Sequence, residues 1–120
     1  MLYEIGEVRQ VEGEGLRRWF TDDFFDLIVW FDEKNVIHGF QLCYDKTGYE
    51  RSLTWKRSSY EHNKIDEGEN QGSQKRSPIL VADGEFEKRR IAYKFWNESK
   101  NIDKKIVEFV YKKILGYNLE

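Results

Sequence analysis

His62 and the acidic residues that follow it are the densest group of side chains in this sequence that could do chemistry. The stretch Tyr60–Glu69 reads YEHNKIDEGE and places Asp66, Glu67 and Glu69 shortly after the histidine. An imidazole with nearby carboxylates can transfer protons or bind a divalent cation. Acidic loops are commonly no more than solvated charge, so this group carries the second of two hypotheses: a small enzyme with acid/base or metal-assisted chemistry centred on His62, Asp66 and Glu67.

Other polar side chains lie on one face of a predicted sheet. Residues 25–56 read as three β-strands joined by two tight turns, in which successive side chains point to opposite faces. The face opposite the predicted core is apolar at one end and polar at the other, and a few polar groups beside an aromatic side chain suit a small molecule or a peptide. The alternative is that helices cover this face and its polar residues form only a rim. The first hypothesis is a soluble binding or interaction module that uses this face, with Trp30, Asp26, Gln41, Glu50 and Ser52 as ligand-binding residues.

The single cysteine and the other histidine are predicted to be structural. Cys43 could act as a nucleophile only beside a base, and strand alternation places His38 on the opposite face, which leaves His62 as the one histidine partner. A cysteine is usually a small buried apolar side chain, and His38 is expected to be a core histidine. The chain has no phosphate loop, nucleophile elbow, zinc-ligand spacing or dinucleotide motif. We therefore expect no cofactor and no metal, and we leave open whether the protein is an enzyme.

Two turns predict the pairing of the central strands. Asp45–Gly48 has Asp first and Gly last, as in a type I turn closed by a left-handed residue, and Asp32–Asn35 places Asn in the left-handed position. Both turns predict the same core face, which only His38 and Arg51 interrupt. The expected cross-strand pairs on that face are Tyr44 with Tyr49, Leu42 with Arg51, Phe40 with Leu53, His38 with Trp55, Phe31 with Val36, Val29 with His38, Leu27 with Phe40 and Phe25 with Leu42.

Further strands are predicted outside this central meander. If Trp55 opposes Tyr60, His62 lies on the core face, whereas a turn one residue shorter places it on the polar face. Residues 66–77 contain no hydrophobic residue and are expected to form a mobile loop. The additional strands are expected over residues 2–11, 16–20, 60–66 and 79–82.

Helical periodicity begins after the last of these strands. Apolar residues recur at helical spacing from about residue 85 to 98 and again from 102 to 114. Asn101 or Asp103 can cap the start of the second helix, and Gly116 can end it. The expected fold class is α+β: an antiparallel meander sheet of five to six strands with two C-terminal helices packed on it.

Composition limits the class of protein and its partners. With 120 residues, of which 39% are apolar and 16% aromatic, the chain is expected to form one globular domain over residues 1–120, with residues 119–120 read as a cloning remnant. There is no run of 18 or more apolar residues and no signal peptide pattern, which predicts a cytoplasmic protein without a membrane partner. A net charge of −2 gives no indication of nucleic acid binding. The expected partner is an unknown small molecule or peptide.

Four segments of the chain share uncommon runs of residues with known proteins. They are WFTDDFFDLIVWFD, GFQLCYDKTGYERSLTW, the stretch from YEH to DEGE, and SPILVADGEF, and together they span about residues 17–87. In these segments the chain resembles a family of small bacterial proteins to which no function is assigned. The resemblance implies a bacterial, cytoplasmic protein with a single domain and supplies no activity. Such relatives often have a second histidine directly after the one that corresponds to His62, and Asn63 stands there in this chain, which argues against a two-histidine metal site.

Overall fold

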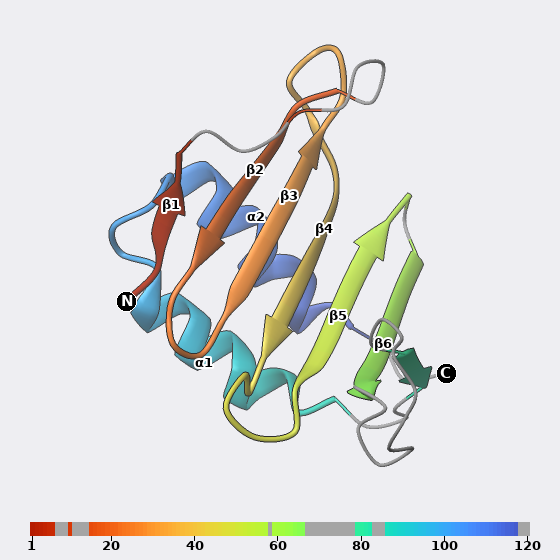
Figure 1. Ribbon diagram of the computed structural model, residues 1–120. Coiled ribbons are helices and arrows are strands. Elements are labelled where there is room, and N and C mark those ends of the chain that lie inside the picture. The colour runs from red at the N-terminus through yellow and green to blue at the C-terminus, as the bar shows by residue number, and fades with distance from the viewer. Residues whose placement is uncertain (7–9, 11–14, 58, 67–78, 83–85, 118–120) are drawn as a thin grey trace.

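The computed structural model describes residues 1–6, 10, 15–57, 59–66, 79–82 and 86–117, with the side chains of residues 64–66 and 79–82 left out (Figure 1). Seven strands form one antiparallel sheet in which each strand pairs with the next along the chain. The elements are β1 (Tyr3–Ile5), β2 (Arg17–Thr21), β3 (Asp26–Phe31), β4 (Ile37–Tyr44), β5 (Arg51–Lys56), β6 (Ser59–Asp66), β7 (Ile79–Ala82), α1 (Lys88–Glu98) and α2 (Lys104–Leu115). The predicted α+β meander with two C-terminal helices is confirmed, with seven strands against the five to six expected. Asp66, the first residue of the loop expected over residues 66–77, belongs to β6, and the rest of that loop and the remnant expected at 119–120 lie outside the described residues.

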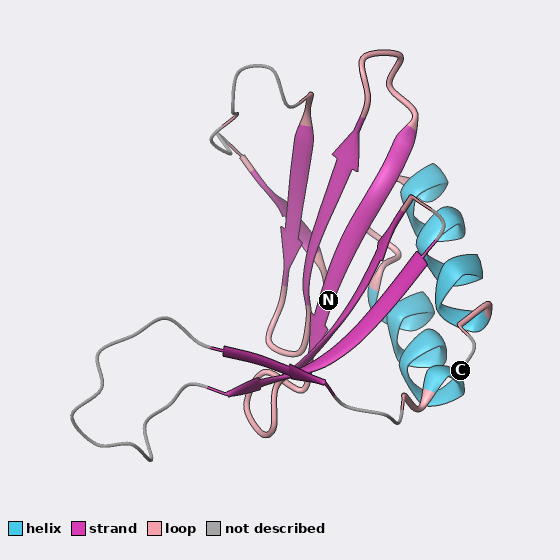
Figure 2. Cartoon of the chain, turned by 90° about the vertical axis from the view of Figure 1, so that its right-hand side faces the viewer, coloured by secondary structure: helices cyan, strands magenta, loops and turns pink. Residues whose placement is uncertain are grey.

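Both helices pack on the same face of the sheet (Figure 2). We call the opposite face, which carries no helix in the described part of the chain, the helix-free face. Strand alternation directs the large apolar side chains toward the helices, where Phe20, Leu27, Leu42 and Leu53 form one fully buried cross-strand row. Burial of one such side chain contributes about 1.5–3 kcal/mol, so this interface is the main source of stability. The helices contribute Ile91, Ala92, Phe95, Ile106, Val107, Val110 and Ile114 to it.

The ends of α2 follow from local chemistry. The side chain of Asp103 accepts a hydrogen bond from the backbone N–H of Lys105 at 2.9 Å, and it is the N-cap. Gly116 is the C-cap, and its N–H donates to the carbonyl of Lys112 at 2.9 Å. Lys112 and Lys113 lie in the last turn, where positive charge is favourable for the helix dipole. The predicted cap at Asp103 and the predicted end at Gly116 are therefore confirmed.

Most predicted cross-strand pairs are wrong by two residues, and Phe31 pairs with Ile37 instead of Val36, although the predicted faces are mostly right. The observed pairs are Leu27 with Leu42, Val29 with Phe40, Phe40 with Trp55, and Leu42 with Leu53. Side chains alternate with a period of two, so a shift of two residues changes the partners and preserves the faces. Leu53 and Trp55 are consequently buried, as predicted.

The β4–β5 connection explains the shift on one side. The Gly48 N–H donates to the Asp45 carbonyl at 3.0 Å, so the predicted turn exists, but the residue with left-handed backbone is Asp45, with φ of 57°. The strands stop at Tyr44 and resume at Arg51, which makes the loop longer than the four residues expected. Val36 and Tyr49 were predicted in the core, but both lie in loops between strands. They are 56% and 72% exposed.

Candidate functional site

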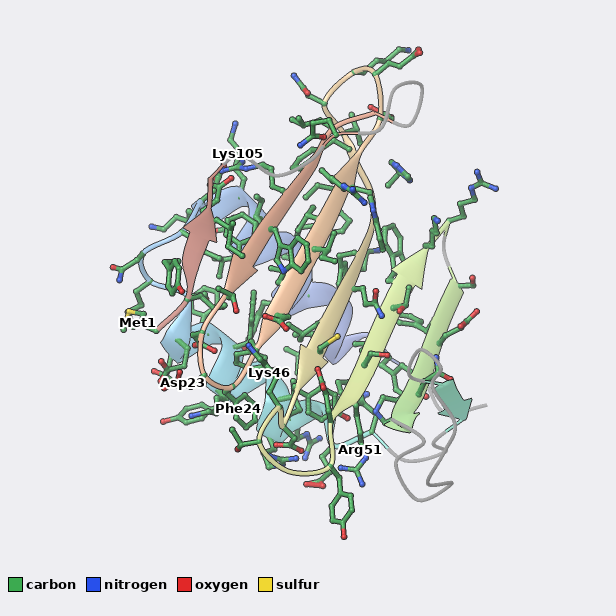
Figure 3. All side chains as sticks on the ribbon, viewed as in Figure 1. Met1, Asp23, Phe24, Lys46, Arg51 and Lys105 are labelled. Carbon is green, nitrogen blue, oxygen red and sulfur yellow. The ribbon has the colours of Figure 1, made fainter. Side chains whose placement is uncertain are left out.

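Three cross-strand rows of side chains cover β2 to β5 on the helix-free face, which faces the viewer in Figure 3. The first row contains a tryptophan between cationic residues, the second is apolar on β2 and β3 and polar on β4 and β5, and the third is polar. Neighbouring rows are about 7 Å apart, because two residues along a strand span that distance. The rows are Arg17, Trp30, Gly39 and Lys56, then Trp19, Ile28, Gln41 and Thr54, then Thr21, Asp26, Cys43 and Ser52.

Four of the five residues predicted to bind a ligand share this face, but they do not converge. Trp30 lies in the first row, Gln41 in the second, and Asp26 and Ser52 in the third. The register predicted from the two turns places Gln41 between Asp26 and Ser52, and this is wrong, because Gln41 pairs with Ile28 and Thr54. Glu50 lies in the loop before β5, and the partner of Cys43 is Ser52 rather than Glu50.

Asp26 is engaged by its own neighbours at the end of the sheet. Its Oδ1 accepts a hydrogen bond from Thr21 Oγ1 at 2.5 Å and from Lys46 Nζ at 3.0 Å. The same ammonium group donates to the carbonyl of Asp22 at 2.7 Å, and Figure 3 shows Lys46 near the β2–β3 connection. Lys46 therefore ties the β4–β5 loop to the β2–β3 connection, and one oxygen of Asp26 takes part in this network.

The β4 and β5 positions of the third row, Cys43 and Ser52, are shielded from solvent to different degrees. Ser52 has no exposed surface, and its hydroxyl has no hydrogen-bond partner among the described residues. Burial, followed by the negative charges of Glu50 and Asp26, raises the pKa of the Cys43 thiol to about 12. A thiol with this pKa stays protonated near neutral pH, which does not favour a nucleophilic role for Cys43.

A β-bulge moves His38 out of the core. Trp30 pairs with Gly39 and Phe31 pairs with Ile37, so His38 is one extra residue between them on β4. An inserted residue reverses the alternation beyond it. Ile37 therefore packs against the core, while His38 is half-buried and lines a cleft beside Trp30. The expectation that His38 is a core histidine is wrong for this reason.

The cleft at this end of the helix-free face has a volume of about 640 Å³. Trp30 is one wall, and it fits because Gly39 has no side chain: a Cβ there would lie 3.2 Å from Trp30 Cε3. Lys56 crosses the same glycine, and its ammonium group lies 5.1 Å from the centre of the Trp30 ring. We call this site the Trp30 cleft. Its lining residues are Gly15, Trp30, Phe31, Asp32, Glu33, Lys34, His38, Lys56 and Arg57.

The rim of the Trp30 cleft is held by specific backbone geometry. Asn35 and Arg57 have left-handed backbone, with φ of 63° and 51°, and the left-handed position of Asn35 was predicted. The Arg57 N–H donates to the His38 carbonyl at 3.4 Å, which ties the β5–β6 turn to the bulge. Asp32 accepts hydrogen bonds from the N–H groups of Val36 and Lys34, and these bonds lower the pKa of its carboxyl group. Left-handed non-glycine residues are uncommon and concentrate at functional sites.

His62 lies on the core face, which settles the alternative that the sequence left open. Trp55 pairs with Tyr60 and Leu53 pairs with His62. The imidazole is 6% exposed, and its Nε2 lies 2.5 Å from the Tyr44 hydroxyl. The rings of Phe86 and Tyr117 also pack against it.

Of the predicted acidic neighbours of His62, the structure describes only the backbone of Asp66. Asp66 lies four residues along the same strand, which is about 13 Å of extended chain. The side chain of Asp66 and all of Glu67 lie outside what the structure describes. Within the described ranges, no group of three or more His, Cys, Asp or Glu residues could hold a metal ion.

No family model, curated protein or solved structure matches this chain. In the part of the chain that the structure describes, no helix is long and apolar enough to cross a membrane. The function therefore has to be inferred from the geometry of the helix-free face.

Proposed function

We propose that the protein is a small binding module and that its ligand is a small molecule held in the Trp30 cleft. The observation that carries this proposal is the β-bulge, which places His38 beside Trp30 at the mouth of the cleft instead of in the core. Bulges are common next to binding and active sites because they redirect a side chain. The cleft volume of about 640 Å³ is in the range of small-molecule sites, roughly 300–1,000 Å³.

The proposed roles of the residues follow from their positions. Trp30 offers an apolar wall that is held firmly, because its ring lies against the backbone of Gly39 and under the side chain of Lys56. His38 offers ring nitrogens that can donate or accept a hydrogen bond. A site on strands holds such groups more precisely than a site on loops alone. Of the five residues predicted from the sequence, Trp30 lies in the cleft and Gln41 lies in the adjacent row.

A fragment titration followed by NMR tests the proposed function. Phenylacetate, phenyl phosphate, benzyl alcohol and benzylamine are added separately to ¹⁵N-labelled protein. At least one of them is expected to shift the indole N–H signal of Trp30 and the amide signals of His38 and Arg57. These three groups all line the Trp30 cleft.

Two tryptophan variants provide the matched comparison. Trp30→Ala is expected to abolish the shifts at His38 and Arg57. Trp19→Ala removes the same kind of side chain from the neighbouring row of the same face, outside the cleft, and is expected to leave them intact. Shifts centred on Trp19 or on the helices, or undiminished binding to folded Trp30→Ala, would contradict the proposal.

A further inference from the structure

We infer that the ligand of the Trp30 cleft is an organic anion, with a carboxylate or phosphate group attached to an apolar ring. This inference rests on the proposed binding function and names its ligand class. Three observations support it. The cleft has more cations than carboxylates, two of these cations have no carboxylate partner among the described residues, and Lys56 is held over the Trp30 ring.

The cleft has more cations than carboxylates. Lys34, Lys56 and Arg57 line it, together with Asp32 and Glu33. The Asp32 carboxylate already accepts hydrogen bonds from the backbone N–H groups of Lys34 and Val36, at 2.8 Å and 3.0 Å. Its negative charge is therefore partly compensated by the turn that it closes. The remaining positive charge faces the cleft.

Three cations elsewhere in the described part of the chain are paired with carboxylates. Arg18 binds Glu4 at 2.7 Å, Lys46 binds Asp26 at 3.0 Å, and Arg90 binds Asp45 at 3.2 Å. By contrast, among the described residues no carboxylate oxygen lies within 4.0 Å of the charged nitrogens of Lys56 or Arg57. Lys34 has only the longer-range attraction of Asp32. These positive charges are available to a ligand.

Lys56 is positioned before any ligand arrives. Its Cγ lies over the bare backbone of Gly39, and its ammonium group lies over the Trp30 ring. A cation held by an aromatic face loses less side-chain freedom when it binds an anion, which favours affinity. The neighbouring Arg57 carries a planar guanidinium group that can bind both oxygens of a carboxylate or phosphate. Trp30 would contact the apolar ring of the same ligand.

The test compares the charge preference of the wild-type protein with that of two lysine variants. Dissociation constants are measured by NMR titration for phenylacetate, phenyl phosphate, benzyl alcohol and benzylamine. At least one anion is expected to bind about tenfold or more tightly than benzyl alcohol, since hydrogen bonds to charged groups are the stronger ones. Lys56→Met keeps the apolar stem over Gly39 and removes the charge, so it is expected to lose most of this preference.

Lys113→Met is the control, because Lys113 also places its ammonium group over a tryptophan, 4.4 Å from the ring centre of Trp55 on the opposite face. This variant is expected to keep the wild-type preference. Arg57→Asn removes the second cation and retains a residue type that tolerates left-handed backbone, so it should reduce the preference as well.

The possible outcomes separate the inference from the function on which it rests. Tighter binding of anions that depends on Lys56 supports the inference, and the better of the two anions identifies the carboxylate or phosphate class. Equal or tighter binding of benzyl alcohol or benzylamine in the cleft overturns the inference and leaves the proposed function standing. If none of the four compounds shifts the signals of the Trp30 cleft, the proposed function fails.

Discussion

His38 and His62 lie beside aromatic side chains of the same sheet, yet their environments are opposite. His62 is under the helices, 6% exposed and hydrogen-bonded to Tyr44. His38 is half-buried at the other end of the sheet and lines the Trp30 cleft on the helix-free face. The alternation of side chains along each strand determines this difference, because it sets which face of the sheet the histidine lies on. His62 keeps the regular alternation of β6, whereas the bulge at Trp30 and Phe31 reverses the alternation at His38.

This comparison shows that a histidine's role can depend on one inserted residue. Without the bulge, His38 would point toward α2 and need a buried partner. With it, the core receives Ile37, and the imidazole becomes available to solvent and ligands. Two neighbouring residues, Ile37 and His38, thus serve the core and the cleft respectively, and the register of the strand decides which of them does which.

The largest expected effect comes from removing the buried histidine. His62→Ala is expected to lower the free energy of unfolding by about 2–4 kcal/mol, because it leaves a cavity and removes a hydrogen-bond partner of the Tyr44 hydroxyl. His38→Ala is expected to lower it by less, about 0.5–1 kcal/mol, because that side chain is only half-buried. Urea denaturation of both variants measures the comparison, and equal losses would show that His38 is also a structural residue.

Tyr44→Phe tests the hydrogen bond alone. The substitution keeps the ring and removes the hydroxyl that lies against His62 Nε2. We expect a loss of about 1–3 kcal/mol, because a buried polar nitrogen loses this partner. The measurement is again urea denaturation, with Tyr49→Phe as control, since Tyr49 is 72% exposed. A neutral result for Tyr44→Phe would mean that packing, not the hydrogen bond, holds His62.

Gly39→Ala tests how the Trp30 cleft is built. The added methyl group would lie 3.0 Å from the Trp55 carbonyl oxygen and 3.2 Å from both Trp30 and Lys56, so these neighbours must move. We expect a loss of about 1–2 kcal/mol from this crowding. The indole N–H signal of Trp30 should also shift. Gly48→Ala is the control, because nothing lies within 4 Å of the position that its methyl group would take. An unchanged Trp30 signal would show that the ring does not depend on Gly39.

The smallest effect concerns Cys43, on the helix-free face. Its pKa is raised from 9.0 to about 12 in the folded protein, so the folded state keeps a proton that the unfolded state loses. The stability that Cys43 contributes is therefore complete below about pH 9 and falls as pH rises toward 12. Between pH 8 and pH 9.5 the wild type should lose at most about 1 kcal/mol relative to Cys43→Ala. A constant difference across this range would show that the thiol is accessible to solvent.

The sequence predicts most of the fold because the alternation of apolar and polar side chains identifies the buried face of a strand even when the predicted pairing of the strands is wrong. The core positions of Leu53 and Trp55 were predicted from pairs that were two residues wrong, since a shift of two preserves the face. The caps of α2 were also predicted, because Asp103 and Gly116 act on adjacent backbone groups. The pairs themselves failed because Asp45, rather than the obvious glycine, takes the left-handed conformation and lengthens the loop.

The candidate site was harder to predict, because it depends on the bulge. Nothing in the alternation of β4 marks His38 as an extra residue. A signal was nonetheless present, since a single glycine inside a strand often marks a bulge or a close approach of another group, and Gly39 is such a residue. Lys56 and Arg57 gave no signal, because charged residues at a strand end are ordinary. Their importance appears only when the β5–β6 turn is seen beside Trp30.

A ribosome makes the sheet of this protein before it makes the helices that cover the sheet. The apolar row of Leu27, Leu42 and Leu53 is therefore complete in the nascent chain while α2 is still to be translated. Leu2 donates its backbone N–H to the Glu98 carbonyl at 2.7 Å, so even the start of the chain is secured only after α1 is made. At roughly 5–20 residues per second, the interval lasts a few seconds. During that time no helix covers the apolar core face, and exposed apolar surface of this kind makes a folding chain prone to aggregation.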